Sequence, residues 1–404
     1  MSALGPHSRL AVGHLVVRRE DEDEYVVGDP TNGNFVAVPE VGARLIELLA
    51  KGCTVAEAET ELEDETGESI DALDFAEVLV EAGVIDGREV GEAEPPKGKF
   101  WVVSRIPSRL VRPLFSRIAW SFYAGCLVAS IAIFVVEPGL LPTYEDTFIF
   151  TDLVLSLVIT NLYTAVVTVI HEIWHAFAGA AVGILSTIRL ERRGIFPVLE
   201  TNLTGLWGLP PERRYGPFLA GMAFDSVVLF TALGLRFAYS RSWIDLPHAM
   251  FRFLAMVVFV QVVKLAFQTL AYLRTDMYLV MTTATGCRNL HQVTRLSLKR
   301  IIRRLKPDEE IVLRDAHERD LRVARWYRLL YLAGLVWMAY FTFRFLVPST
   351  IVVLGWAGGV LSAAPVGTQH WWEAVFLVLF ALLNIGLPLA VVIRNRLHAR
   401  RAVT

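Results

Sequence analysis

Two histidines four positions apart, with a glutamate directly after the first, are the residues of this sequence with the clearest capacity for chemistry. His171, Glu172 and His175 lie in an apolar stretch long enough to cross a membrane as a helix. Four residues turn a helix by roughly 400°, so both imidazoles share one face about 6 Å apart along the axis. This spacing suits one zinc ion, and Glu172 is placed to accept a proton from a metal-bound water.

The apolar surroundings decide between a metal site and coincidence. The HExxH pattern is short and arises by chance in many sequences. Inside a span, however, each ionisable group costs about 2.5–3.5 kcal/mol on insertion scales. Three such groups at 171, 172 and 175 therefore favour a shared metal ion over a chance arrangement.

A catalytic zinc site needs a third protein ligand and one open position. Asp276 is the first candidate, because it closes a later apolar stretch on the same predicted side of the membrane as the histidines. Its alternative role is a helix-end carboxylate paired with Arg274. Asp225 lies deeper in another apolar stretch, and its alternative role is a hydrogen bond to a neighbouring helix.

The elements that must position these residues are membrane helices. The chain has 404 residues, 54% of them hydrophobic, with a mean hydropathy of +0.46. Several apolar runs reach the ~20 residues needed to cross a bilayer. Six spans are predicted, at about 119–136, 153–183, 215–235, 249–272, 326–347 and 371–392. A shorter glycine-containing run at 351–361 is interpreted as an outer re-entrant or loop segment.

Charge predicts the orientation of these spans. Basic residues at 105–117 precede the first span and an acidic loop at 137–152 follows it, which places the N-terminus in the cytoplasm. With six spans, the basic segments 288–325 and 394–401 fall on the same side. We therefore expect a multi-pass protein of the cell membrane with both termini cytoplasmic. The 288–325 segment is interpreted as a solvated face that contacts anionic lipid.

The first 94 residues differ from the rest in charge and pattern. They contain 23 acidic and 6 basic residues, an excess that argues against nucleic-acid binding. Turn residues at 29–33 separate two β-prone runs, and helical periodicity follows at 42–49, 55–62 and 72–82. This order predicts a small α/β winged-helix-like soluble domain. No cleavable signal peptide is visible, and the three cysteines match no disulfide framework or thiolate metal site.

The segment 189–211, between the second and third spans, allows two interpretations. Strand-like runs at 196–200 and 203–206 could pair with an extended substrate peptide, or the segment could be an ordinary loop. The remaining histidines of the membrane part show no ligand spacing and are interpreted as surface or interface residues. The four considered are His248, His291, His317 and His370.

The membrane part resembles the site-2 protease family of intramembrane zinc metalloproteases, especially its bacterial branch of peptide zinc metalloproteases. One motif is 171–176, which in that family supplies two zinc ligands and the general base. The second is 268–290, similar to the family pattern NLNPFLRLDGYYxLxDxxGxPNL, and its register implies Asp276 as the third ligand. The sequence departs from that pattern in four residues, which are Gln268, Ala271, Met277 and Thr283.

Residues 10–87 resemble a PqqD-like domain, the winged-helix peptide-recognition module of systems that make ribosomally synthesised, modified peptides. The resemblance rests on the order of strands, turn and helices, with the runs 35–43 and 79–85. It implies that a leader peptide adds to the edge of the sheet beside the third helix.

These observations predict an α-helical polytopic membrane protein of about six spans. The expected parts are a PqqD-like domain (1–90), a linker and basic juxtamembrane segment (91–118), a metalloprotease core (119–290), a basic cytoplasmic segment (291–325) and C-terminal helices (326–404). The resemblance implies a zinc-dependent endopeptidase that cleaves a modified peptide or its leader, working beside export or peptide-modification partners. Two alternatives are cleavage of a membrane-anchored regulator and a non-proteolytic export or immunity subunit.

Overall fold

The computed structural model describes residues 4–21, 24–29, 34–67, 70–85, 101–102, 107–184, 186–193 and 196–382. The chain is mostly helical, at 73%, with a small three-stranded sheet near its N-terminus. It forms two compact units. The first consists of residues 1–115, 175–189 and 200–217, and the second of residues 116–174, 190–199 and 218–404.

The N-terminal sheet is an antiparallel meander. Its strands β1 (Val16–Asp21), β2 (Glu24–Asp29) and β3 (Asn34–Pro39) pair in sequence order, with Val27 opposite both Val17 and Val36. Three helices follow, α1 (Glu40–Ala50), α2 (Val55–Thr66) and α3 (Ala72–Glu81). The predicted hairpin and all three predicted helices are confirmed, with boundaries shifted by a few residues.

Capping residues mark the ends of α2 and the start of α3, and one apolar core packs all three helices against the sheet. Thr54 and Glu57 form a capping box at the start of α2, and Gly67 ends α2 in the left-handed conformation that favours glycine. Asp71 caps α3 by accepting from the backbone N–H of Asp74. The core joins the sheet to all three helices through fully buried residues, including Val27, Leu45, Ile46, Leu48, Leu62 and Leu79.

A buried arginine ties this domain to a distant part of the chain. The guanidinium of Arg214 donates to both carboxylate oxygens of Glu20 on β1, at 3.3 and 3.1 Å, and to the carbonyls of Trp207 and Leu209. Arg214 is 1% exposed and lies 4.9 Å from the Trp207 ring. A Cβ at Gly208 would meet the Phe35 ring of β3 at 3.4 Å. The N-terminal sheet therefore packs on the short 3-10 helix η4 (Thr204–Gly208).

Arg214→Met is expected to loosen this contact. Loss of the buried guanidinium leaves Glu20 with Arg18 as its remaining charged partner and costs roughly 2 kcal/mol, equivalent to about a 30-fold rise in local opening. Hydrogen exchange of the amides at 204–208 in the full-length protein measures that rise. The exposed neighbour Arg213→Met is the matched control, and equal exchange rates in the two variants would show that the ion pair does not hold the domain.

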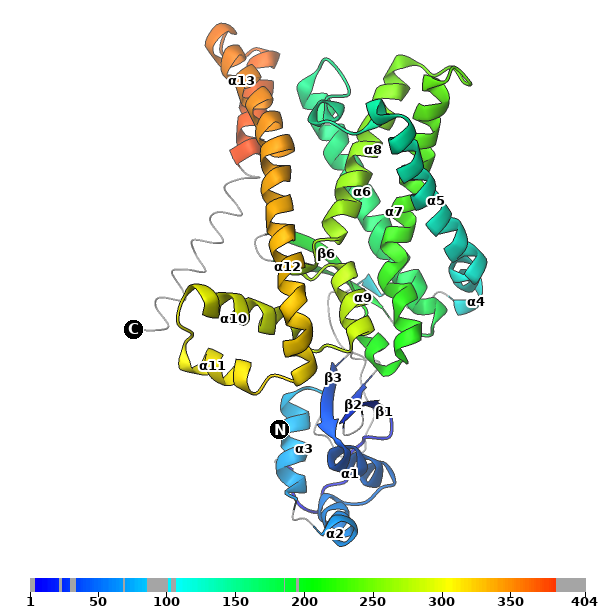
Figure 1. Cartoon of the computed structure of the whole chain (residues 1–404), viewed down its shortest axis with the longest axis vertical. Coiled ribbons are helices and arrows are strands. Elements are labelled where there is room, and N and C mark those ends of the chain that lie inside the picture. Colours follow the sequence, from blue (N-terminus) through cyan, green and yellow to red (C-terminus); the bar gives the residue numbers. More distant parts are fainter. Residues whose placement is uncertain are drawn as a thin grey trace. The chain divides into compact units, whose positions relative to one another are not determined.

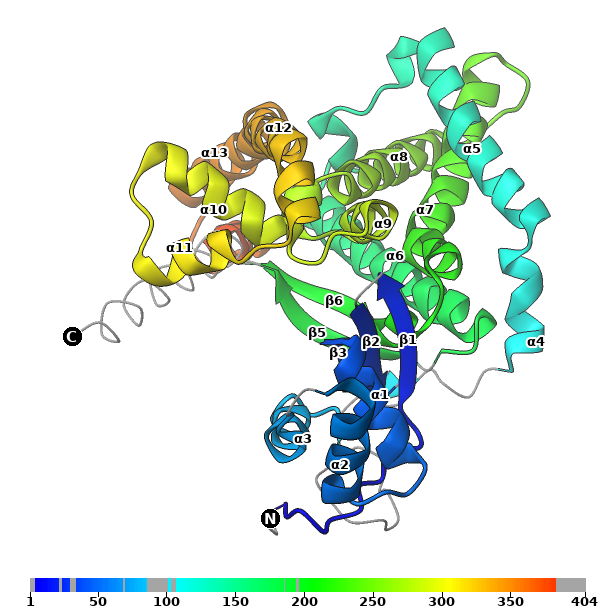
Figure 2. The same ribbon diagram turned by 60° about the horizontal axis from the view of Figure 1, so that its bottom comes forward.

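Five helical segments in the described part of the chain are long and apolar enough to cross a membrane. Figure 1 and Figure 2 show α6, α7 and α8 running side by side, and one apolar core connects them through Val167, Leu233 and Met256. The five segments are α5 (Arg117–Val136), α6 (Leu153–Ala181), α7 (Pro211–Ser240), α8 (His248–Gln268) and a continuous run over Glu318–Ala363. The predicted sixth span at 371–392 begins in a shorter apolar helix, Gln369–Leu382, and its remainder lies outside the described residues.

The segment 351–361, interpreted from the sequence as an outer re-entrant or loop segment, is helical, so the loop alternative was wrong. The run over 318–363 is α12 (Glu318–Phe341), a π-helical turn η6 (Thr342–Leu346) and α13 (Val347–Ala363), so the segment is helical. Each glycine costs a helix about 1 kcal/mol relative to alanine. Leaving backbone groups unbonded in apolar surroundings costs several kcal/mol each, so the helix continues through its three glycines.

A second small sheet precedes α7. Strands β4 (Trp101–Val102), β5 (Thr187–Arg193) and β6 (Phe196–Asn202) lie in the order β4-β5-β6, with Trp101 opposite Ile188. The strand predicted at 196–200 is confirmed. The strand-like run at 203–206 was misread, because it lies in η4: Asn202 accepts from the amide and hydroxyl of Thr204 and turns the chain there.

The remaining elements connect these parts. They are α4 (Ser108–Val111), η1 (Arg112–Phe115), η2 (Pro138–Leu140), η3 (Tyr144–Thr147), η5 (Ala271–Leu273), α9 (Asp276–Thr285), α10 (Leu290–Ile302) and α11 (Pro307–Arg314). Helices α9, α10, α11 and α12 share a core that includes Tyr278, Leu290, Val293, Leu313 and Tyr327.

Candidate metal centre

Helix α6 presents both histidines of the motif in its last turns. His171 is 2% exposed and His175 is 3% exposed, so neither imidazole is in contact with bulk solvent. Asp276, the first residue of α9, reaches the same place and is 9% exposed. One ligand atom from each of the three side chains lies within 4.8 Å of the other two. The sequence-predicted ligands are thus brought together, and this group could hold a metal ion.

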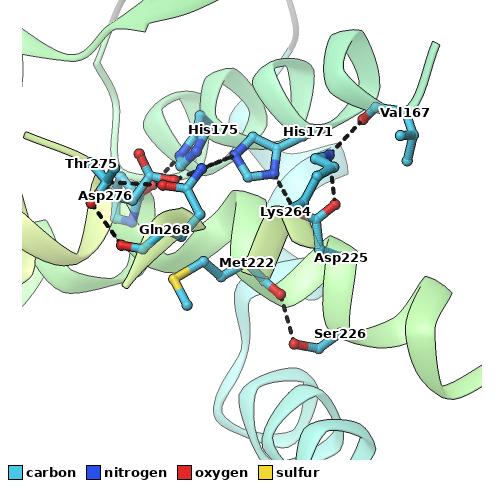
Figure 3. A network of polar contacts seen from close by, with 11 residues as sticks. Val167, His171, His175, Met222, Asp225, Ser226, Lys264, Gln268, Thr275 and Asp276 are labelled. Carbon is cyan, nitrogen blue, oxygen red and sulfur yellow. Dashed lines mark hydrogen bonds and ion pairs between the residues drawn. The ribbon is translucent and has the colours of Figure 1, made fainter. Parts of the chain in front are cut away.

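Hydrogen bonds orient both imidazoles toward that group (Figure 3). The Nδ1 atom of His171 lies 2.7 Å from Oδ2 of Asp225, and Nδ1 of His175 lies 2.7 Å from the carbonyl oxygen of Pro217. A carbonyl only accepts, so Nδ1 of His175 carries a proton, and in the neutral imidazole Nε2 keeps the lone pair that a metal requires. Metal-binding histidines characteristically donate their second N–H to a carboxylate or a backbone carbonyl. Both partners are present here.

Asp225 is itself held by a lysine. Its Oδ1 accepts from Nζ of Lys264 on α8 at 2.9 Å, and the same Nζ lies 3.3 Å from the carbonyl of Val167 on α6. Asp225 is fully buried at 0% exposed. A carboxylate in a helix that is apolar enough to cross a membrane requires such a partner. Asp225 therefore joins three helices by hydrogen bonds, and it lies outside the group of potential metal ligands.

Gln268, the last residue of α8, fixes the start of α9. Its Oε1 accepts from the backbone N–H of Asp276 at 3.3 Å, and its backbone carbonyl accepts from the Thr275 hydroxyl at 2.6 Å. Its Nε2 then lies 3.4 Å from Nε2 of His171. Gln268 is one of the four departures from the site-2 protease pattern, and its side chain places an amide beside the candidate ligands.

The chain turns sharply between η5 and α9. Arg274 adopts a φ of 57°, in the left-handed region that non-glycine residues seldom occupy. This turn lets Asp276 begin a new helix that points its carboxylate back toward α6, with Oδ2 3.4 Å from Nε2 of His171.

Glu172 follows His171 on α6 and is half-buried. Its neighbours on the helix are thus the two histidines, one position before and three positions after.

Among the other histidines, His291 is half-buried on α10 beside Tyr278. Burial, together with Arg274 and Arg295, lowers the pKa of His291 to about 4, so it is neutral at physiological pH. It lies outside the candidate ligand group.

Two of these supports were not predicted from the sequence. Lys264 carried a usable signal, because a lysine in an apolar span needs a counter-ion and Asp225 is an acidic residue in a neighbouring span. The carbonyl of Pro217 carried no such signal, since every residue has a carbonyl.

Comparison of the chain with protein-family models, with curated proteins and with solved structures finds no match.

Asp225→Ala is expected to weaken metal binding by about 10- to 100-fold, the effect typical of removing a partner that orients a histidine ligand. Without Asp225, Nδ1 of His171 has no acceptor and the ring loses its fixed orientation. Competition with a chelating dye measures the affinity. Asp245→Ala, in an exposed loop, is the control. Equal affinities for the two variants would show that Asp225 does not support the site.

Proposed function

We propose that this chain is a zinc-dependent membrane endopeptidase, similar to the site-2 proteases, that hydrolyses a peptide bond near the cytoplasmic membrane face. The observation that carries the proposal is the buried group of His171, His175 and Asp276, whose ligand atoms lie within 4.8 Å of one another on helices next to Glu172. Two imidazoles and one carboxylate are a donor set that suits zinc better than magnesium or calcium. The hydrogen bonds to both Nδ1 atoms fit the same conclusion.

Zinc, when bound, would lower the pKa of a coordinated water to ~7 and polarise the carbonyl of the scissile bond. The residues of the chain supply the remaining steps. Glu172 accepts a proton from the attacking water and passes it to the leaving amine as general acid. Asp225 and the Pro217 carbonyl hold the two imidazoles in place throughout. The amide of Gln268 is close enough to the histidines to contact a substrate there.

The N-terminal domain is proposed to capture the substrate. Its three-stranded sheet, two edge strands and three helices are the elements of a PqqD-like fold, in which a peptide adds as a further strand. A ribosomally made precursor peptide or its leader is the substrate proposed by this resemblance. The acidic composition of the domain favours a basic or neutral peptide over nucleic acid.

Removal of the metal tests the proposal. The full-length protein in detergent is incubated with a peptide mixture, and mass spectrometry identifies the products before and after treatment with a chelator. We expect cleavage to stop on chelation and to return on addition of zinc. Absence of any cleavage by a zinc-loaded protein would instead favour a non-proteolytic export or immunity subunit. Cleavage only of peptides that carry their own membrane span would favour a regulator as substrate.

A further inference from the structure

Helices α10 and α11 both expose apolar side chains. Ile301 and Ile302, in the last turn of α10, are 69% and 78% exposed, and Ile311 and Val312 on α11 are 49% and 39% exposed. These residues are outside the five segments that could cross a membrane. Arginines and a lysine surround the isoleucines, namely Arg300, Arg303, Arg304 and Lys306, and all four are exposed. We call the residues from 300 to 306 the basic turn.

The N-terminal end of α10 packs on α12 near the point where α12 becomes apolar, and the basic turn lies at the other end of α10. The N-terminal half of α12 is rich in charged residues up to Arg328, and the run from Leu329 to Phe341 carries none. Helix α10 packs on this boundary, because its Leu290 and Val293 share a core with Tyr327. In both ribbon views α10 and α11 lie across the direction of α12 (Figures 1 and 2). The surface of a membrane crossed by the apolar part of α12 would therefore run along α10.

The composition of the basic turn fits one kind of partner. Adjacent isoleucines among cations are the pattern of segments that rest on a membrane, with the apolar groups at the acyl boundary and the cations at phosphate level. Arginine binds phosphate oxygens through paired N–H donors. A soluble protein with an acidic, apolar groove would accept the same residues, but it would leave residue 302 exposed to water in vesicles that lack that protein.

We propose that the basic turn inserts into the headgroup layer of the adjacent leaflet and binds anionic lipid phosphates there. This inference goes beyond the proposed peptidase activity and does not depend on it. It has a consequence for the candidate metal centre, because α10 follows α9, whose first residue is Asp276. Asp320 of α12 accepts from the backbone N–H groups of Arg288 and Asn289 and so fixes the junction of α9 and α10. The lipid contact would anchor the helix that carries the third candidate ligand.

An environment-sensitive fluorophore on residue 302 tests the proposal. The full-length chain, with its three cysteines replaced by serine and Ile302→Cys labelled, is reconstituted into phosphatidylcholine vesicles and into vesicles of equal parts phosphatidylcholine and phosphatidylglycerol. Val336→Cys, 70% exposed on the apolar part of α12, is the lipid reference, and Glu61→Cys, exposed on α2, is the aqueous reference. We expect emission and iodide protection at residue 302 to approach those at 336, more fully in the anionic vesicles.

The charges are tested separately in the same vesicles. Arg303→Gln with Arg304→Gln is expected to lower the ratio of inserted to detached turn about fivefold per arginine in anionic vesicles only. Arg9→Gln with Lys51→Gln, exposed on the N-terminal domain, removes the same charge elsewhere and should change nothing. Emission at residue 302 equal to that at residue 61 in both vesicles would overturn the proposal. If the double arginine variant inserts as much more fully into anionic vesicles as the wild type does, then these arginines do not bind the lipid phosphates.

Discussion

Glu172→Gln is expected to keep the metal of the wild-type protein and to lower the rate of peptide hydrolysis by about 10²- to 10⁴-fold, the range of general acid–base catalysis. Glutamine has nearly the same shape as glutamate but cannot accept the proton of the attacking water. Glu172 is half-buried and lies outside the candidate ligand group, so its replacement leaves the three ligands in place. Elemental analysis gives the metal content, and product formation from a cleaved peptide gives the rate.

The matched control for this experiment is Glu212→Gln. Glu212 is an exposed glutamate in the first turn of α7 and has no place in the proposed chemistry. Its variant should cleave at the wild-type rate. If Glu172→Gln also cleaves at that rate, Glu172 is not the base. If the variant loses its metal, the residue has a structural role at the site rather than a catalytic one.

Replacement of any one of the three candidate ligands by alanine is expected to reduce the bound zinc from about one ion per chain to a small fraction after dialysis, because a zinc held by two protein ligands is in fast exchange. The variants are His171→Ala, His175→Ala and Asp276→Ala. Elemental analysis of the dialysed protein measures the loss. A wild-type protein without zinc after loading would contradict both the site and the peptidase proposal.

Two controls separate ligand loss from misfolding. His248→Ala removes an exposed histidine at the start of α8, and Asp245→Ala removes an exposed carboxylate in the preceding loop. Both should retain the full zinc content. Asp276→Ala should lose more zinc than Asp225→Ala, since Asp225 acts only through His171. A greater loss of zinc from Asp225→Ala than from Asp276→Ala would indicate that Asp225 is the metal ligand.

The part of the site that could be predicted from the sequence is the part that a single helix determines. His171 and His175 share a face of α6 whatever surrounds them, because the helix period alone sets their spacing. Asp276 lies 101 positions after His175 in the sequence. Its selection over Asp225 needed the family pattern, because both carboxylates end up near His171.

The remaining features depend on packing between helices. The contact of Lys264 with Asp225 requires α7 and α8 to lie together at one register, which hydropathy does not specify. The helix through 351–361 was missed because glycine and short length were weighed more heavily than backbone hydrogen bonding in apolar surroundings. The contact between Glu20 of the N-terminal sheet and Arg214 joins residues 194 positions apart, and no local sequence pattern predicts it.

The imidazole of His175 is held by a main-chain carbonyl and that of His171 by a side chain, and this difference affects what a genetic screen of the protein would reveal. Any amino acid at position 217 supplies the carbonyl that holds this imidazole, whereas only a few side chains at position 225 can replace the carboxylate that holds the other. A saturation scan of α7 should thus tolerate conservative helix-compatible changes at 217 and reject most changes at 225. Substitution data would therefore suggest unequal support for the two histidines, although each imidazole donates a hydrogen bond of 2.7 Å from its Nδ1.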